Sequence, residues 1–468
     1  MGWPALPRHP IRRDFGMRKT YREWAPDQNY LFPPSPRDWL PENDLVYFLI
    51  DTVATLDLSP TFAHYERELR GQPPFHPRLM VTLLLYCYAT GTRSSRKIMR
   101  RCRTDVACRI IVGEDVPDFR TISEFRKTHL ARLETLFVEV LKLCTLAGLT
   151  RVGTIALDGT KIKANASRHK AMSYDRMKED EKRLKEEIAR LMAEAEAADA
   201  AEDEAHGRDR SGDEIPDELK RRESRLAKIL EAKALLEERA RAEAAEDASR
   251  HQAEGKSPPT IPPAEAVPEP KDQINFTDPE SRIMKTSNKG WDQCGNAQAV
   301  ANENQIILAA DVTNQSNDKR QAVPMVDQTL ENLKAAGVHQ PIGAAVIDSG
   351  YYSEANTTAL EQRGVDPHIA TERLKHNEEI PPVPRGRIPE NLSVKQRMQR
   401  KLRTKKGREQ YAKRKGIIEP IFGQMKQALG FRQFSLRGLA AMRAEWRLMC
   451  TVHNLLKLWR QGQAAVAG

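Results

Sequence analysis

The chain has 468 residues, of which 30% are charged and 40% hydrophobic, and its net charge is +10. This length allows two or three domains with at least one substantial core. The positive charge indicates a polyanionic partner, most commonly nucleic acid. The longest apolar stretch, residues 79–89, is far shorter than the roughly 20 residues that span a bilayer, so we expect no membrane partner. The six cysteines lack the spacing of a zinc site or a disulfide framework, which indicates free thiols in a soluble, cytoplasmic protein.

The N-terminal third divides into an extended arm and a helical domain. Residues 1–41 are rich in Pro, Arg and aromatic side chains and show little periodicity. Residues 42–148 are helical in pattern: Pro77 begins a strongly apolar helix that runs to Tyr88, and the capping-box spacing of Thr121 and Glu124 predicts a helix from about Ile122. A basic cluster in this domain suits a helix-turn-helix-like DNA-binding domain; it comprises Arg93, Arg96, Lys97 and Arg100. The alternative is a plain helical domain with a solvated basic face.

An α/β domain begins where the periodicity changes. Residues 151–164 form a β-rich run in which Asp158, expected at the strand's end, shares one face with Ile162 while Lys161 and Lys163 point the other way. A predicted hairpin (296–313), an amphipathic helix (321–336), a buried strand ending at Asp348 and a helix capped by Ser353 follow. This order predicts an α/β domain with a mixed sheet, built from residues 149–175 and 272–460 and followed by a tail, 461–468.

A segment of about 100 residues, 176–271, interrupts this domain. Apolar residues recur at heptad-like spacing in two stretches, which predicts an antiparallel coiled-coil hairpin; they are Met177, Leu184, Ile188, Leu191 and Leu219, Leu226, Ile229, Leu236. A proline-rich linker follows the hairpin. Both signs of charge on the hairpin's outer faces favour contact with protein, and we expect it to reach a second subunit; the alternative is a solvated arm without a partner.

The stretch KRKGIIEPIFGQMKQALGFRQFSLRG, residues 413–438, places one acid, Glu419, among lysines and arginines. Pro420 predicts a helix break at this glutamate. An ordinary surface salt bridge between Glu419 and Lys415 is the simplest interpretation. About half of the residues from 395 to 415 are basic, which suits either a surface that tracks DNA phosphates or a solvated segment.

Three acids share one arrangement: Asp158 and Asp348 at strand ends and Glu419 on a later helix. Such carboxylates can hold two Mg²⁺ ions, which activate the nucleophile and stabilise the leaving oxygen in phosphodiester chemistry. Asp311 also ends a predicted strand and is a rival for the second acid, but Asp348 is preferred because a turn and a capped helix follow it directly.

These blocks resemble the DDE transposases of bacterial insertion sequences, which have the ribonuclease H-like fold of the retroviral-integrase superfamily. The matching stretches are IALDGTKIKANAS around Asp158, VIDSGYYSEAN around Asp348 and YAKRKGIIEPIFGQMK around Glu419. The last resembles a Tyr, Arg, Glu, Lys signature, here Tyr411, Arg414, Glu419 and Lys426, with one extra residue between the arginine and the glutamate. On an unbroken helix, Lys415 and not Arg414 would face Glu419, so both are candidates for DNA contact.

The resemblance implies a bacterial, nucleoid-associated enzyme that binds the terminal inverted repeats of its element and joins them to target DNA. It implies two Mg²⁺ ions as cofactor, with Mn²⁺ as a substitute, and double-stranded DNA and a second copy of the chain as partners. Asp158, Asp348 and Glu419 would be the catalytic metal ligands. The basic residues named above, with Tyr411 and Lys426, would contact DNA.

Two alternatives stay open at this point. One is a DNA-binding or scaffolding relative without catalysis, and the other is a stand-alone metal-dependent nuclease, which would stop at hydrolysis. Tyr351, Tyr352 and Trp291 either stack on unpaired bases near the cut end or pack in the core or at its rim.

Overall fold

The computed structural model describes residues 36–467 apart from 68–72, 207–216, 254–256, 258–259, 287–289, 373–381, 385, 387–388 and 390. The arm predicted for residues 1–41 therefore falls mostly outside the described residues. Among the described residues, no single helix is long and apolar enough to cross a membrane; one bent pair of helices, Leu45–Thr55 with Ser59–Tyr65, is long and apolar enough by length and composition alone.

The N-terminal part of the described chain is helical. Its elements are η1 (Pro36–Trp39), α1 (Leu45–Thr55), α2 (Ser59–Tyr65), α3 (Pro77–Ala89), α4 (Ser95–Thr104), α5 (Val106–Val112), α6 (Phe119–Thr128) and α7 (Leu130–Leu146). Helix α3 begins at Pro77, as predicted, and all but two of its residues are buried, so it forms the centre of this part. Helix α6 begins at Phe119, earlier than predicted, because the Asp118 carboxylate accepts a hydrogen bond from the Arg120 amide and caps the helix there.

A mixed six-stranded sheet forms the second part. Its strands are β1 (Thr154–Lys163), β4 (Arg282–Lys285), β5 (Trp291–Asn302), β6 (Ile307–Thr313), β7 (Ala344–Ile347) and β8 (Asp366–Ile369). Strands β1, β7 and β8 are parallel neighbours, β5 runs antiparallel to β1, and β4 and β6 both pair with β5 on its other edge. This mixed sheet with its helices is consistent with the expected ribonuclease H-like fold.

Helices cover the sheet and follow it in the chain. They are α10 (Ala322–Ala335), η4 (Ser349–Tyr351), α11 (Glu354–Gln362), α12 (Val394–Arg403), α13 (Lys405–Ile417), α14 (Glu419–Gly423), the π-helical turn η5 (Gln424–Ala428) and α15 (Leu439–Ala467). Helix α13 packs on β1 and β7, whereas α10 and α15 pack on β5 and β6. Helix α15 extends through the residues for which we predicted a tail, because the alanines and glutamines after Trp459 favour helix and no proline interrupts them.

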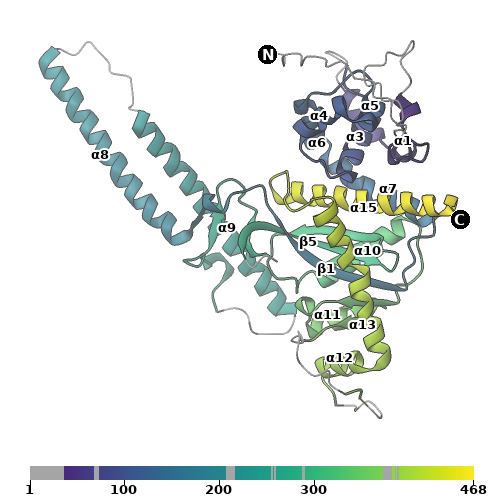
Figure 1. Ribbon diagram of the computed structural model, residues 1–468. Coiled ribbons are helices and arrows are strands. Elements are labelled where there is room, and N and C mark those ends of the chain that lie inside the picture. The colour runs from purple at the N-terminus through teal and green to yellow at the C-terminus, as the bar shows by residue number, and fades with distance from the viewer. Residues whose placement is uncertain are drawn as a thin grey trace, which may run out of the picture.

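One apolar core runs through both parts. It contains buried side chains from α1 to α7 together with side chains from β1, β5, β6, β7 and α15. Helices α7 and α15 lie side by side between the N-terminal helices and the sheet (Figure 1). The helical part and the sheet are therefore packed as one body.

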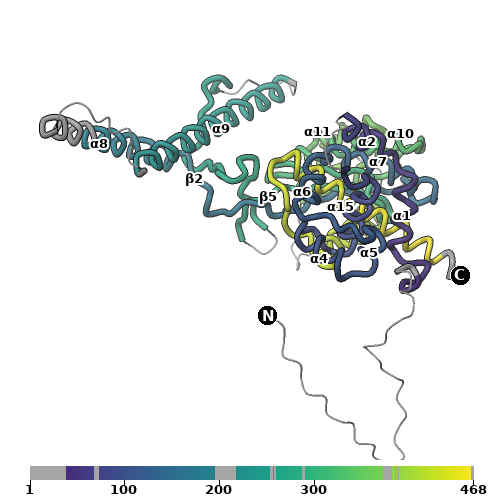
Figure 2. Tube along the Cα trace, turned by 90° about the horizontal axis from the view of Figure 1, so that it is seen from above, coloured from purple at the N-terminus to yellow at the C-terminus, as the bar shows by residue number. Residues whose placement is uncertain are grey.

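Two long helices interrupt the sheet domain after β1. The inserted elements are η2 (Arg168–Lys170), β2 (Ala171–Ser173), α8 (Tyr174–His206), α9 (Asp217–Ala253), η3 (Pro263–Glu265) and β3 (Gln273–Asn275). Helices α8 and α9 pack along each other and project away from the body, as Figures 1 and 2 show. A small separate core holds their base and contains predicted seam residues, among them Met177, Leu184, Ile229 and Leu236.

Charged residues occupy part of the seam between these two helices. Lys233 pairs with Glu181 at 2.8 Å, Arg222 with Glu187 at 2.7 Å and Arg225 with Asp180 at 3.3 Å. These pairs replace apolar contacts, so the hairpin has a thin hydrophobic seam away from its base.

Candidate active site

Asp158 and Asp348 lie on neighbouring parallel strands. Leu157 of β1 is in register with Ile347 of β7, so the two aspartates occupy successive register positions. Strand β7 is a short, fully buried apolar run that ends at Ile347, and Asp348 occupies the N-cap position of the turn η4 without a side-chain capping hydrogen bond. Strand β1 does not end at Asp158, as we had predicted, but continues to Lys163 because β5 pairs with its whole length.

Glu419 stands at the start of α14, directly after a helix break. Helix α13 ends at Ile417, Ile418 separates the two helices, and Pro420 lies in the first turn of α14. This is the break that Pro420 predicted. The Glu419 side chain is 52% exposed, so solvent reaches it. The π-helical turn that follows is a type of irregularity found often at functional sites.

Arg414 connects two of the three acids. One terminal nitrogen of its guanidinium lies 2.8 Å from the Asp158 Oδ2 atom, and the other lies 3.6 Å from the Glu419 Oε1 atom. Arg414 is half-buried, whereas Lys415 is exposed. The expectation that Lys415 faces the glutamate is wrong, because the break at Ile418 absorbs the extra residue of the signature. The predicted Lys415–Glu419 pair is replaced by the pair with Arg414.

Burial determines the electrostatics of this cluster. It raises the pKa of Asp158 to about 6, against the opposing effect of Arg414, and the nearby carboxylates of Asp348 and Asp318 raise it further. Burial also raises the pKa of Tyr411, against the opposing effect of Arg414, and the charges of Asp348 and Asp158 raise it further. At Asp158, the effect of burial therefore outweighs that of the one nearby cation.

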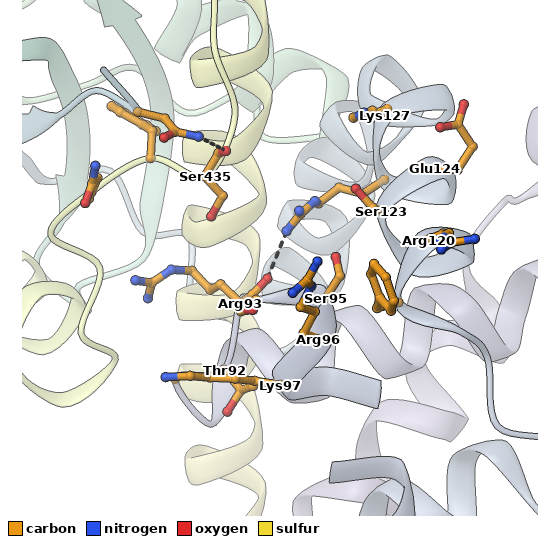
Figure 3. A pocket seen from close by; sticks show the side chains of 17 residues that line it. Thr92, Arg93, Ser95, Arg96, Lys97, Arg120, Ser123, Glu124, Lys127 and Ser435 are labelled. Carbon is orange, nitrogen blue, oxygen red and sulfur yellow. Dashed lines mark hydrogen bonds between the residues drawn. The ribbon is translucent and has the colours of Figure 1, made fainter. Parts of the chain in front are cut away.

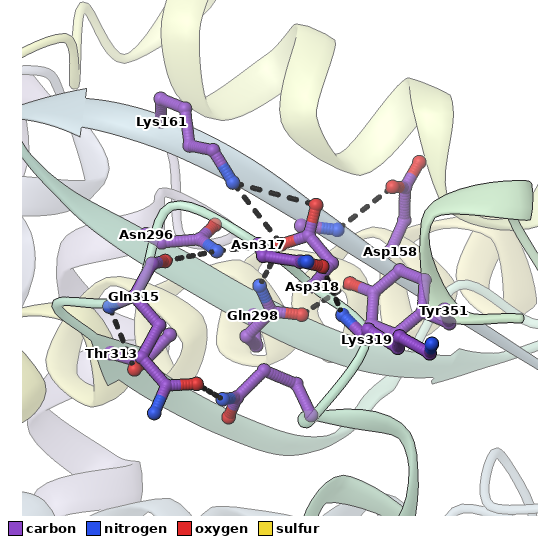
Figure 4. Close-up of polar contacts among 12 residues, drawn as sticks. Asp158, Lys161, Asn296, Gln298, Thr313, Gln315, Asn317, Asp318, Lys319 and Tyr351 are labelled. Carbon is purple, nitrogen blue, oxygen red and sulfur yellow. Dashed lines mark hydrogen bonds and ion pairs between the residues drawn. The ribbon is translucent and has the colours of Figure 1, made fainter. Parts of the chain in front are cut away.

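A carboxylate that the sequence analysis missed lies beside these residues. Asp318, in the loop between β6 and α10, accepts hydrogen bonds from Lys161 at 3.1 Å, Asn296 at 2.6 Å and Gln298 at 2.9 Å (Figure 4). Gln298 in turn accepts a hydrogen bond from the Tyr351 hydroxyl. The sequence signal for this acid was the pair Asn296 and Gln298, which alternate on a buried strand. Fully buried amides require polar partners, and Asp318 is the partner of both.

The predicted lysines occupy different environments. Lys161 is paired with Asp318, and Lys163 pairs with Asp292 at 2.8 Å. Lys426 bonds to the Thr160 hydroxyl, two residues beyond Asp158 on the same face of β1. Of the three, Lys426 therefore lies on the aspartate's face of the strand, and the other two lie on the opposite face.

The N-terminal cations gather elsewhere. Arg93, Arg96 and Lys97 line a pocket of about 730 Å³ between the helical part and the loop at 433–435 (Figure 3). Arg100 lies on α4 with Arg96 and Lys97 and is exposed, but it does not line the pocket. The structure thus separates a carboxylate cluster at the sheet from a basic pocket beside it.

The rival acid and the aromatic candidates lie away from the carboxylate cluster or inside the core. Asp311 is on β6, which is not a neighbour of β1, and its carboxylate lies 2.9 Å from Arg443 of α15. Tyr351 is 1% exposed and belongs to the core, while Trp291 is exposed. The buried hydroxyl of Tyr352 has no hydrogen-bond partner within the described part of the chain. All six cysteines are buried and free, as expected.

Two family models match the chain. A transposase domain (DUF772) matches residues 34–128, and a transposase DDE domain matches residues 247–455. The chain belongs to the DDE transposases of insertion-sequence type. No curated protein and no solved structure matches it.

The two matched regions map onto the fold in a simple way. The first covers most of the N-terminal helices of this transposase, and the second begins near the end of α9 and contains Asp348 and Glu419. Asp158 lies before the second region, because the inserted helices separate β1 from the rest of the sheet. Because β1 pairs with β5 and β7, Asp158 nevertheless lies at the centre of the sheet of that domain.

Enzymes of this family cleave and transfer DNA and normally use divalent metal ions. In the described part of this transposase, no three Asp, Glu, His or Cys side chains are arranged so that they could hold a metal ion. Instead, the Arg414 guanidinium lies between Asp158 and Glu419. The chemistry of the donor set nevertheless fits a divalent cation, because carboxylate oxygens are the ligands that Mg²⁺ prefers.

Proposed function

We propose that this transposase binds the terminal inverted repeats of an insertion sequence, cleaves the phosphodiester bonds at their ends and joins them to target DNA. The observation that carries the proposal is the register of two parallel strands, which places Asp158 beside Asp348, together with the Arg414 guanidinium, which reaches both Asp158 and Glu419. Three acids distant in sequence thus belong to one locality.

Asp158 and Asp348 would hold Mg²⁺, or Mn²⁺ in its place, and Glu419 would complete the ligand set once its half-exposed side chain turns away from Arg414. When bound, two such ions supply charge neutralisation at the scissile phosphate, activation of the attacking oxygen and stabilisation of the leaving oxygen. The ligands must be ionised to act, and burial raises the pKa of Asp158 to about 6, so below that pH a cation would have to displace the proton of this carboxyl.

The other residues of the site would act on the DNA. Arg414, once released by Glu419, offers a planar guanidinium suited to bidentate contact with a phosphate. Lys426 is fixed beside Thr160 and would contact the backbone on the same face of β1. Lys161 and Lys163 are committed to acids of their own chain, so we assign them supporting roles at the edge of the DNA path.

The coiled-coil hairpin and the helical part would organise the complex. We assign the helices from α1 to α7 to DNA binding through their basic cluster. The hairpin exposes large apolar side chains on its outer faces, and this supports contact with a second subunit in a dimer or higher oligomer; they are Met192, Leu230 and Leu235.

A strand-transfer assay tests this function. Duplexes that carry the inverted repeats flanking the gene are incubated with a target plasmid, with Mg²⁺ or with a chelator. We expect cleavage at the repeat ends and joined products only with the metal ion. Cleavage without joining would identify a stand-alone nuclease, and binding without cleavage would identify a catalytically inactive DNA-binding relative.

A further inference from the structure

The pocket between the helical part and the catalytic domain is a basic cavity with two walls. Helices α4 and α6 form one wall, and Asn165 with the loop at 433–435 forms the other. Among the lining residues the structure describes, six are cationic and one is acidic. The labelled acid, Glu124, points away from Arg93 and Ser435 (Figure 3).

No carboxylate of the described chain forms an ion pair with these cations; they are Arg93, Arg96, Lys97, Arg120, Arg126 and Lys127. Arg93 donates to the carbonyl oxygens of Leu429 and Gly430, at 2.8 and 2.9 Å, and its guanidinium lies over the Phe431 ring. These contacts hold the guanidinium in place, and the buried Glu445 carboxylate acts on the charges of Arg93 and Arg126. The other four cations of the lining have only Glu124 as an acidic neighbour within it, so the pocket carries a net positive charge that an anion from outside can balance.

A buried network holds the two walls together. Arg126, 6% exposed, donates to the Tyr88 hydroxyl at 3.1 Å, and that hydroxyl lies 3.5 Å from the carboxylate of Glu445 on α15. The same carboxylate accepts the backbone amides of Ser435 and Leu436, at 2.8 and 3.3 Å. The Nε atom of Arg126 has no hydrogen-bond partner in the described chain. The walls are thus fixed relative to each other before any ligand arrives.

The pocket lies within reach of the carboxylate cluster along one strand. Asn165 lies two residues after the end of β1. The backbone of Lys163, the last residue of β1, forms an isolated β-bridge with Gln433 in the second wall. From Asp158 to Lys163 the strand rises about 17 Å, at roughly 3.3 Å per residue. At about 3.4 Å per base pair, this distance corresponds to roughly five base pairs of duplex.

We infer that this pocket binds backbone phosphates of the element-end DNA, about five base pairs from the scissile bond, and fixes the end relative to the carboxylates. The inference rests on the proposed function and deepens it, because it gives this basic cluster a specific contact, the DNA backbone, and a position relative to the scissile bond. Lysine and arginine side chains with serine hydroxyls on a preorganised surface are the groups that contact phosphate in protein–DNA interfaces. The lining comes from both walls, so a phosphate bound in the pocket would contact the N-terminal helices and the catalytic domain together.

Salt dependence of DNA binding tests the pocket. The pocket variant Lys97→Ala/Lys127→Ala removes two exposed cations of the lining, and the control Arg103→Ala/Arg109→Ala removes two exposed cations outside it, one of them also on α4. The probe is a short fluorescein-labelled duplex of arbitrary sequence with a chelator present, because phosphate contacts are independent of sequence. Binding is measured by anisotropy over a range of salt concentrations.

We expect the slope of log K against log salt to fall by about two in the pocket variant, roughly 0.9 for each lost phosphate contact, and by less than half of that in the control. The variant Lys97→Arg/Lys127→Arg keeps the charges and should keep the slope. Equal slopes in the pocket variant and the control would overturn the inference. If wild type binds and cleaves but the slopes are equal, only the inference falls; if wild type binds no DNA, the proposed function falls with it.

Discussion

The Arg414 guanidinium lies 2.8 Å from the Asp158 carboxylate although 256 residues separate the two in the chain. The contact joins β1, at the centre of the sheet, to α13, which packs on β1 and β7. The same guanidinium reaches Glu419, so a single cation holds the charge of two acids. In the metal-free protein, Arg414 therefore compensates part of the negative charge that a divalent ion would balance.

Arg414→Ala should reduce DNA cleavage by about tenfold to a hundredfold, since a charge-assisted contact contributes roughly 1.5–3 kcal/mol. Lys415→Ala is the matched control: it removes the adjacent cation, which is exposed, and should leave the rate within about threefold of wild type. Single-turnover cleavage of a repeat-end duplex measures both. A larger loss of cleavage rate in Lys415→Ala than in Arg414→Ala would mean that Lys415, and not Arg414, contacts the DNA.

Asp158→Asn should stabilise the metal-free protein, and more so at high pH. The folded-state pKa of about 6 lies above the usual 3.8, so this carboxyl favours the folded state while protonated and loses that contribution as the pH rises through 6. The two-unit shift corresponds to at most about 3 kcal/mol. Urea unfolding at pH 5 and pH 8 with a chelator should show an advantage of the variant that grows with pH. An advantage that shrinks with pH would mean that Arg414 outweighs burial.

The strand that ends before Asp348 and the helix break beside Glu419 could be predicted because they depend on local signals. An apolar run before Asp348, a serine cap after it and a proline beside Glu419 each act within a few residues. The roles of Arg414 and Lys415 could not be assigned, because helix periodicity was extended across the break at Ile418. Asp318 was missed because its partners lie on β1 and β5, and no local pattern marks a loop residue that becomes close only when the sheet forms.

Arg126→Met should destabilise the whole body by about 3–5 kcal/mol, because it leaves the buried Glu445 carboxylate without its nearby cation. Lys127→Met, at the next and exposed position, should change stability by less than about 0.5 kcal/mol. Chemical denaturation followed by circular dichroism measures both. Similar small effects would show that the interface between the helical part and α15 does not depend on this charge network.

Removing residues 188–221 tests the hairpin. A short Gly/Ser bridge from Glu187 to Arg222 is feasible, because these side chains form an ion pair at 2.7 Å, and the base core with Leu184 and Ile229 is kept. We expect loss of the oligomer by light scattering and loss of pairing between two labelled repeat ends. A variant that still assembles and still joins ends would leave the hairpin without this role.

The most direct test of the carboxylate site compares binding and cleavage in Asp348→Asn. The substitution removes one of the proposed metal ligands but none of the basic surface. Asp311→Asn is the control, because this aspartate lies on the same sheet and pairs with Arg443 outside the site. Gel shift and cleavage are measured on one repeat-end duplex with Mg²⁺. The account predicts that Asp348→Asn binds DNA like wild type and does not cleave it, while Asp311→Asn does both; cleavage by Asp348→Asn at the wild-type rate would contradict it.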